Sequence, residues 1–255
     1  MRFASLGSGS RGNGLVVEAG STRILLDCGF GLGETTLRLG RLGLTAEDLS
    51  AIIVTHEHSD HIGGVARLAR RHCIPVWLTH GTLTGFEALF SGIGKLNVIN
   101  DYRSFAVGDL QVEPFPVPHD AREPAQFVFG DGSRRLGVLT DTGSSTRHIE
   151  ATLSGCDALV LECNHDSGML QASSYPQKLR ERIAGRFGHL DNVTAAELLA
   201  RLDTARLKHL VAAHLSQENN RPDLARAALA GAMGCDPDWI EVADQDNGLG
   251  WRTIG

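Results

Sequence analysis

The sequence predicts an α/β chain in which two β-sheets pack face to face and helices cover their outer faces. The prediction depends on a repeated order: apolar strand-like runs come first, helical segments follow, and this order occurs twice along the chain. The 255 residues are 42% hydrophobic and 21% charged, which is typical of a folded chain with a sizeable core. Neither a linker nor a low-complexity tract divides them, so we expect a single domain over residues 1–255.

The first half of the chain is rich in short apolar runs bounded by turn residues, which is typical of strands. These runs place strands at about 2–6, 14–19, 22–27, 51–55, 75–78, 97–100, 104–107, 110–117 and 127–129. Apolar residues at helical spacing, such as Val65, Leu68 and Ala69, predict helices at about 34–43, 62–70 and 82–90.

The second half alternates strands with longer helices. Buried-strand runs lie at 135–139, 158–161 and 209–213, and a closing strand pair is expected at 239–242 and 250–254. Pro176 is placed to open one helix, and Pro222 opens an Ala-rich helix that ends near Gly234. Between them, the spacing of Thr194 and Glu197 matches a capping box and predicts another helix start.

Six of the expected strands are followed at once by an acid or a histidine. The six residues are Asp27, His56, His119, Asp141, Glu162 and His214. In α/β sheets, ligands gather beyond one edge of the strands, where the following loops meet. The repetition therefore predicts one site that is assembled from many strand ends.

The densest polar stretch is the turn between the strand at 51–55 and the helix at 62–70, with the order His56-Glu57-His58-Ser59-Asp60-His61. Three histidines within six positions are unusual in a chain with 11 histidines among 255 residues, so a merely solvated polar loop is the weaker interpretation. Imidazole and carboxylate groups together suit Zn²⁺ and similar divalent ions. The stretch therefore predicts a metal site.

The HxHxDH order and the Thr55 that precedes it resemble the metallo-β-lactamase superfamily, and the resemblance extends over almost the whole chain. It implies an αββα sandwich, with two mixed sheets and helices on the outer faces. It also implies two divalent metal ions, Zn or Mn, as cofactors. By the family pattern, the first metal would be held by His56, His58 and His119, and the second by Asp60, His61 and His214.

Two further aspartates take their expected roles from the same resemblance. Asp141 would bridge the two metals, since members that act on phosphodiesters and thioesters have Asp here, where β-lactamase-type members often have Cys. Asp27 would accept the free N–H of a metal-bound histidine, as carboxylates beside metal sites usually do. The alternative at each of these positions is an ordinary surface acid.

Within the superfamily, several segments resemble the YycJ (WalJ) branch, which is linked to 5′-to-3′ exonuclease action on DNA. The segments are 8–13, 162–166 with Met169 and Leu170, 188–190, and 214–216 with Asn219 and Asn220. Asp191 departs from this branch, which more usually has Ser there. The short stretch between Asp141 and His214 has no room for the large inserted domain of RNase J-like and cleavage-factor nucleases, so no such domain is expected.

The resemblance to nuclease members also implies three catalytic residues: Asp60, Glu162 and His189. Asp60 would act by holding the second metal. His189 would contact the scissile phosphate or protonate the leaving group, and Glu162 would keep this histidine charged and oriented. The alternative is that Glu162 and His189 are two ordinary polar residues.

Candidate substrate contacts lie in two segments. Lys178, Arg182 and Arg186 fall at positions i, i+4 and i+8, so one helix face could follow a phosphate backbone, and a solvated basic face is the alternative. Ser10 and Asn13 belong to a Gly-rich loop whose backbone N–H groups could cradle a phosphate. A plain hairpin loop is the favoured alternative, because the loop lacks the P-loop lysine pattern.

The leading interpretation is a dinuclear metal-dependent phosphodiesterase that acts on nucleic acid, on DNA rather than RNA, as a 5′-to-3′ exonuclease. The alternatives are an RNA-directed nuclease, a glyoxalase II-like thioesterase and a non-catalytic metal scaffold. The net charge of −6 gives no general attraction for nucleic acid, so binding must come from a local basic patch or from the metals. No apolar leader follows Met1 and no membrane span is seen, which predicts a cytoplasmic protein.

Overall fold

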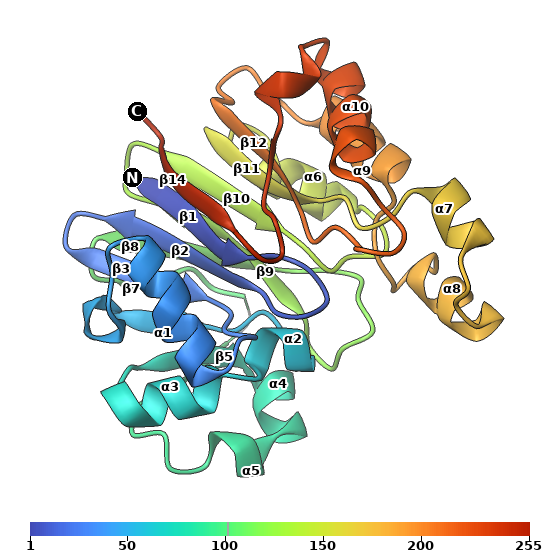
Figure 1. Cartoon of the computed structure of the whole chain (residues 1–255). Coiled ribbons are helices and arrows are strands. Elements are labelled where there is room, and N and C mark those ends of the chain that lie inside the picture. Colours follow the sequence, from blue (N-terminus) through green and yellow to red (C-terminus); the bar gives the residue numbers. More distant parts are fainter. Residues whose placement is uncertain (101) are drawn as a thin grey trace.

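The computed structural model, which describes residues 1–100 and 102–255, contains two seven-stranded β-sheets with helices on the outside (Figure 1). The first sheet has the order β14-β1-β2-β3-β4-β5-β6, formed by Leu249–Thr253, Arg2–Gly7, Gly14–Ala19, Thr22–Leu26, Ala51–Ile53, Val76–Thr79 and Leu96–Ile99. The second has the order β13-β12-β11-β10-β9-β8-β7, formed by Glu241–Val242, His209–Ala213, Ala158–Glu162, Arg135–Leu139, Ala125–Gly130, Leu110–Pro116 and Phe105–Val107. The αββα sandwich expected from the sequence is confirmed.

Both sheets are mixed, with an antiparallel half and a parallel half. In the first sheet β1, β2 and β3 are antiparallel, whereas β3 to β6 run parallel. In the second sheet β7 to β10 are antiparallel, whereas β10 to β13 run parallel. Parallel strands have to be covered on both faces, and the crossover helices provide that cover.

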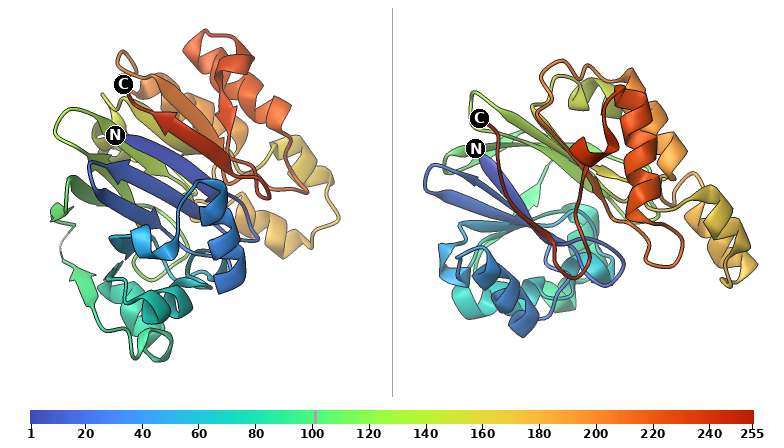
Figure 2. Two further views of the ribbon diagram at one scale, coloured as in Figure 1. Left: turned by 60° about the vertical axis from the view of Figure 1, so that its left-hand side comes forward. Right: turned by 45° about the horizontal axis from the view of Figure 1, so that its top comes forward.

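The helices divide into two groups along the chain. The first group consists of α1 (Leu32–Arg41), α2 (Ser59–Ile62), α3 (Val65–His72), α4 (His80–Gly85) and α5 (Glu87–Phe90), with the 3₁₀ turn η1 (Ala46–Asp48). The second consists of α6 (Arg147–Leu153), α7 (Ser167–Ala172), α8 (Gln177–Ile183), α9 (Asn192–Arg201) and α10 (Pro222–Met233), with η2 (Pro237–Trp239). Figure 2 shows the groups on opposite sides of the sandwich, with α7 and α8 projecting from one end. None of the helices in the described ranges has the length and apolar character of a membrane-crossing segment.

Three apolar layers hold this arrangement together. Residues from both sheets, among them Phe3 and Phe127, form the layer between the sheets. A second layer packs the first sheet against α1 and α3 through residues such as Leu39. A third packs the second sheet against α6, α9 and α10, with Leu198 and Leu229 fully buried. Burial of this much apolar surface fixes the strands, so the loops that follow them start from rigid positions.

Three expectations about individual elements are corrected by the structure. The two closing strands do not pair with each other, because β13 joins the second sheet beside β12 while β14 joins the first beside β1. The helix expected at 82–90 is divided into α4 and α5, since Phe86 leaves the helical conformation with φ −142°. The helix expected from Thr194 begins at Asn192 as α9.

The N-terminus of α9 explains the presence of Asp191. Its Oδ1 accepts hydrogen bonds from the backbone N–H groups of Val193 (2.8 Å) and Thr194 (2.9 Å), so Asp191 is the N-cap residue of this helix. Serine is also a good N-cap residue, so the departure from the branch pattern retains the same local function.

A prediction follows for this cap. Asp191→Ala should lower the free energy of unfolding by about 1 kcal/mol, because two N–H groups of α9 lose their acceptor, whereas Asp191→Ser should stay close to the parent protein. Denaturant titration followed by circular dichroism would measure both. The exposed Asp238→Ala is the matched control and should change stability little. Equal stability of Asp191→Ala and the parent protein would contradict the capping role.

The polar residues expected at strand ends lie at or just beyond the ends of their strands. Asp27, His56, His119, Asp141 and His214 follow β3, β4, β8, β10 and β12, and Glu162 is the last residue of β11. Three of them have left-handed backbone conformations, with φ of 60° at Asp27, 50° at Asp141 and 55° at His214. Such conformations are uncommon for residues with a Cβ and occur most often at functional sites.

Candidate metal centre

Three histidine rings converge where the first metal is expected. His56 Nε2 lies 3.0 Å from His58 Nδ1, and His119 Nε2 lies 3.2 Å from the same atom. His56 and His119 are buried, while His58 is partly exposed at the edge of the pocket. Three ring nitrogens that approach one point are an arrangement able to hold a divalent ion.

Asp60, His61 and His214 form the second group. Asp60 Oδ2 lies 3.3 Å from His61 Nε2 and 3.6 Å from His214 Nε2. The turn that carries Asp60 packs closely on the loop after β3: a Cβ atom on Gly29 would lie only 1.8 Å from the Asp60 carbonyl oxygen. Only glycine allows this approach. The missing side chain at Gly29 therefore lets the loop after β3 pack directly against the turn that carries the histidines.

Asp141 lies between the two groups. Its Oδ2 is 3.2 Å from His61 Nε2, and its Oδ1 is 4.0 Å from His119 Nε2. Asp141 also forms a possible ligand group with His56 and His61, one residue from each triad. This is the position that a bridging carboxylate needs.

The buried histidines share one orientation: Nε2 faces the cluster and Nδ1 faces a protein group outside it. The partners of the Nδ1 atoms, at 2.8 to 3.1 Å, are Asp27 for His61, Thr55 for His56, the Gly188 carbonyl for His119 and Glu162 for His214. Partners of this kind fix the tautomer and aim the Nε2 lone pair at the centre. Asp27 therefore lies where the resemblance places it, and Thr55 supports it by donating to Asp27 Oδ2 at 2.8 Å.

The donor set fits divalent metal ions. Among the described residues, two buried atoms at the centre of the cluster, Asp141 Oδ2 and His214 Nε2, make no hydrogen bond of ordinary geometry, although Oδ2 lies 3.2 Å from His61 Nε2 and Nε2 lies 3.6 Å from Asp60 Oδ2. Unpartnered buried polar atoms cost about 1–3 kcal/mol each, and both lie where the triads meet. Burial, together with the like charge of His61, holds the pKa of His56 well below its ordinary value, so this imidazole is neutral and able to bind a metal.

The carboxylate at the centre stays ionised although it is buried. Burial alone would raise the pKa of Asp141, but the charges of His214 and His61 outweigh it and hold that pKa well below its usual range. Conversely, burial lowers the pKa of His214, but the Asp141 charge and the contacts with Asp60 and Glu162 raise it to about 10. The cluster therefore combines buried negative charge with several imidazoles, which is the composition of a cation site.

Glu162 and His189 form a pair beside the cluster. Glu162 Oε1 lies 2.8 Å from His189 Nδ1, and Oε2 accepts the backbone N–H groups of Thr142 and Leu190. Burial opposes ionisation of Glu162, but the charge of His189 and its hydrogen bond lower the pKa of Glu162 to about 2. Burial lowers the pKa of His189, and Glu162 and Asp141 more than compensate, so this pKa is raised. The structure therefore brings together the two residues that the resemblance pairs.

The basic row expected before His189 is not present as a continuous helix face. Helix α8 ends before Arg186, so this residue lies outside the helix, and the expectation of one face is wrong. Arg182 lines the same pocket as the metal residues and forms an ion pair of 2.5 Å with Asp120. Lys178 is exposed and lies outside the lining of that pocket.

The two candidates in the Gly-rich loop have different positions. Ser10 is exposed and lines the pocket beside Asp60 and His214. Asn13 is only 7% exposed, and its Nδ2 lies 3.2 Å from Asp60 Oδ2 and 3.1 Å from the Gly9 carbonyl. Its amide is used inside the protein, which favours a role in orienting Asp60 over contact with substrate.

Several residues of the site were not named as site residues from the sequence, although Asn164 and Ser216 lie in segments that carry the branch resemblance. The pocket has a volume of about 380 Å³ and is also lined by Asn164, Tyr175 and Ser216. Asp120 Oδ1 lies 3.6 Å from His119 Nε2. Asp120 could have been predicted as a site residue because it directly follows His119. Tyr175 could not, because its position depends on the tertiary packing of the segment before α8.

The first prediction at this site concerns metal content. The chain should bind two divalent ions, because two separate triads converge on either side of Asp141. Protein loaded with Zn²⁺ or Mn²⁺, freed of excess ions and measured by elemental analysis should contain two per chain. His58→Ala should remove most of the metal and the hydrolytic activity together. His72→Ala is the matched control, since His72 lies on α3 and pairs with Glu47. One metal or less in the parent protein would contradict the prediction.

Comparisons with known proteins agree with this geometry. A family model described as the β-lactamase superfamily domain matches residues 22–214. Exodeoxyribonuclease YycJ of Bacillus anthracis is 37% identical over 234 residues, which cover 90% of this chain and 88% of the relative. Exodeoxyribonuclease WalJ of Streptococcus pneumoniae is 32% identical over 237 residues, which cover 91% and 88%.

A solved structure supports the fold independently of sequence. The metallo-β-lactamase fold protein YhfI from Bacillus subtilis superposes with a TM-score of 0.76 and covers 99% of both chains, at 18% identity. The family model spans most of this chain, and the sequence relatives cover about nine tenths of it. The chain therefore belongs to the β-lactamase superfamily, as a metal-dependent hydrolase with the metallo-β-lactamase fold.

Proposed function

We propose that this chain is a dinuclear phosphodiesterase that removes nucleotides from DNA in the 5′-to-3′ direction. The observation that carries the proposal is the Glu162–His189 pair, which lies directly beside the two possible metal triads, with His189 Nδ1 3.6 Å from Asp141 Oδ1. The names of the two relatives, both exodeoxyribonucleases, support DNA as the substrate and the exonuclease mode.

The two triads would hold the cofactors, with Asp141 between them, and Zn and Mn both suit this donor set. When bound, two divalent ions supply activated water at neutral pH and positive charge for the phosphate and leaving oxygens. Phosphoryl transfer asks a protein mainly for positioning and charge stabilisation. The Asp60 carboxylate lies beside His61 and His214, which complete the second triad. The Asn13 amide orients this carboxylate.

His189 contributes what the metal residues do not, a proton for the leaving oxygen. Glu162 fixes its Nδ1 side, so the other ring nitrogen is left to face the pocket that His189 lines. An imidazolium in this place can give its proton as the bond to the leaving oxygen breaks. Glu162 cannot rotate away, because its second oxygen accepts two backbone N–H groups.

The alternatives differ in what they require. A glyoxalase II-like thioesterase needs the two metal groups but has no evident use for the Glu162–His189 pair, since a thiolate leaves without a proton. An RNA-directed nuclease would use the same pair, and only a substrate comparison separates it from the DNA enzyme. The cytoplasmic location and the single-domain organisation stay predictions.

The proposed function is tested by turnover with matched substrates. Protein loaded with Zn²⁺ or Mn²⁺ should release mononucleotides from a DNA oligonucleotide labelled at the 3′ end, with shortening that starts from the 5′ end. An RNA of the same sequence and a thioester should be hydrolysed more slowly. Metal-stripped protein is the control for each substrate. Rapid thioester hydrolysis with intact DNA would overturn the proposal, and faster cleavage of the RNA would replace DNA with RNA as the substrate.

A further inference from the structure

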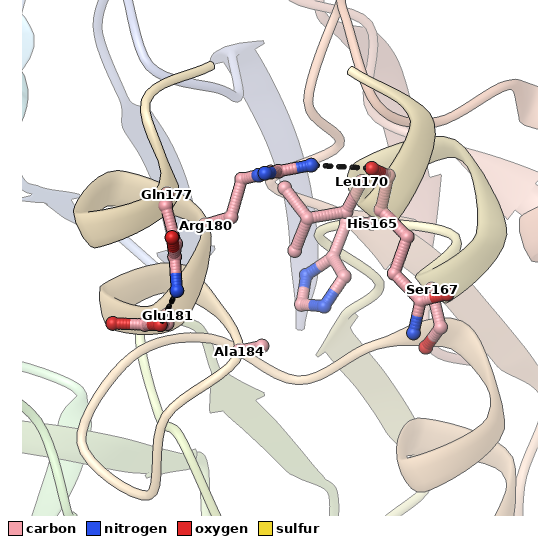
Figure 3. A pocket seen from close by; sticks show the side chains of 8 residues that line it. His165, Ser167, Leu170, Gln177, Arg180, Glu181 and Ala184 are labelled. Carbon is pink, nitrogen blue, oxygen red and sulfur yellow. Dashed lines mark hydrogen bonds between the residues drawn. The ribbon is translucent and has the colours of Figure 1, made fainter. Parts of the chain in front are cut away.

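Helix α8 separates two pockets and presents a different face to each. Leu179, Arg182 and Ile183 line the metal pocket. The opposite face lines a second pocket of about 400 Å³ between α7 and α8, with Gln177, Arg180, Glu181 and Ala184 on the helix side (Figure 3). None of the residues of α8 is buried, and its two apolar residues, Leu179 and Ile183, both face the metal pocket. The helix therefore forms a wall between two cavities rather than part of the core.

The face toward the metal pocket is apolar over most of its length. Leu179 and Ile183 lie one turn apart on α8, and Tyr175 precedes the helix; all three line the pocket and are half-buried. The same pocket is also lined by groups of the metal centre, among them Asp60 and His214. In the described part of the chain, the Tyr175 side chain has no hydrogen bond to another residue, so its ring is not held by a polar contact.

A pocket with a charged floor and an apolar wall fits a ligand that has both characters. A phosphodiester flanked by a nucleoside has them: the phosphate belongs at the metal centre, and the base and sugar offer flat apolar surface. Bases stack on aromatic side chains with little regard to sequence, because every base has a π-face. Arg182 lines the same pocket, where its guanidinium is paired with Asp120 at 2.5 Å.

We propose that Tyr175, Leu179 and Ile183 form a seat for the base and sugar of one nucleotide beside the scissile phosphate, with the Tyr175 ring stacked on the base. This inference rests on the proposed function and deepens it. The pocket of about 380 Å³ has the size of a small-molecule site, so it receives one base at a time. A base on this seat has left its partner strand, so at least one base at the end that is degraded has to be unpaired.

The first experiment uses the parent protein and varies the DNA. Two single-stranded oligonucleotides are compared with a normal one, each lacking a single base, at the first or at the second nucleotide. One of them should show a KM about 10- to 100-fold above that of the normal DNA, because the stacking contact is missing. Equal KM values for all three would overturn the base seat.

The second experiment asks whether Tyr175 provides this contact. Tyr175→Ala should raise the KM for normal DNA by the same factor and should cause no further rise with the base-deficient DNA, since the same contact is lost only once. Tyr175→Phe should restore the KM of the parent protein. Gln177→Ala is the matched control, because Gln177 faces the second pocket and bonds Glu181. A further KM rise when variant and base-deficient DNA are combined would overturn the role of Tyr175.

Failure of the seat and failure of the proposed function give different results. If normal DNA and base-deficient DNA are degraded with the same KM, the exonuclease function stands and the proposed base-binding seat is wrong. If bis(p-nitrophenyl) phosphate is hydrolysed but no DNA is degraded, the proposed function fails and the seat fails with it. If Tyr175→Ala does not fold, the first experiment, with the parent protein and base-deficient DNA, still tests the base-binding seat.

Discussion

Asp60→Asn is expected to remove hydrolysis while the protein stays folded. Asp60 is proposed to hold only the second metal, and its carboxylate meets His61 Nε2 at 3.3 Å and His214 Nε2 at 3.6 Å. Asparagine keeps the shape but has no charge for a cation. Because one metal cannot both activate water and stabilise the leaving oxygen, the rate on DNA should fall on the order of a thousandfold.

Three measurements decide the Asp60 prediction. Turnover of DNA should be lost, elemental analysis should give about one metal per chain in place of two, and thermal unfolding should stay within a few degrees of the parent protein. Ser59→Ala is the matched control, since Ser59 is the neighbouring residue of the same turn and lines the same pocket without a ligand atom of its own among the proposed set. Near-normal turnover in Asp60→Asn would show that this protein does not use two metals.

His189→Ala is expected to separate metal binding from catalysis. The protein should retain both metals, because His189 is not in the proposed ligand set, and should lose cleavage of DNA by about 10²–10⁴-fold, the typical effect of removing a general acid. Glu162→Gln should reduce the rate in the same direction but less. The histidine is still present in that variant, and only its orientation and charge are weakened through the 2.8 Å contact with Nδ1.

A change of leaving group tests the role of His189 directly. Bis(p-nitrophenyl) phosphate releases an anion that needs no proton, so His189→Ala should slow this reaction much less than it slows DNA cleavage. His165→Ala is the matched control: His165 is buried, follows β11 and lines the second pocket (Figure 3). If both substrates slow equally in His189→Ala, the residue acts as a structural residue or a metal ligand, and the proposed proton transfer is wrong.

The sequence alone was sufficient for the architecture, and it pointed to the residues that the structure gathers into the candidate metal centre. Short β-branched runs predict strands because their side chains fit a sheet. An acid or histidine directly after such a run must therefore lie where the strand ends. The grouping of His56, His58 and His119 came from family resemblance, and the structure brings these rings together as that grouping requires.

The contacts between distant segments could not be predicted in this way. The closing strands were expected to pair because they are neighbours in the sequence, yet β13 and β14 join different sheets, since each sheet offers an unpaired edge. The basic row failed because helical spacing continues through Arg186 while the helix ends at Ile183. Spacing shows which residues would share a face, but it does not show where the helix stops.

The sequence by itself determined the local features of this protein: the strands, the polar residues at their ends and the histidine turn, because each depends on neighbouring residues and on a period of two or 3.6. Only the tertiary structure decided what those residues do to one another. The Asn13 amide orients Asp60, Arg182 pairs with Asp120, and Tyr175 lines the same pocket as the metal centre. Each of these contacts joins segments far apart in the chain, and their positions depend on the packing of whole sheets and helices rather than on any local pattern.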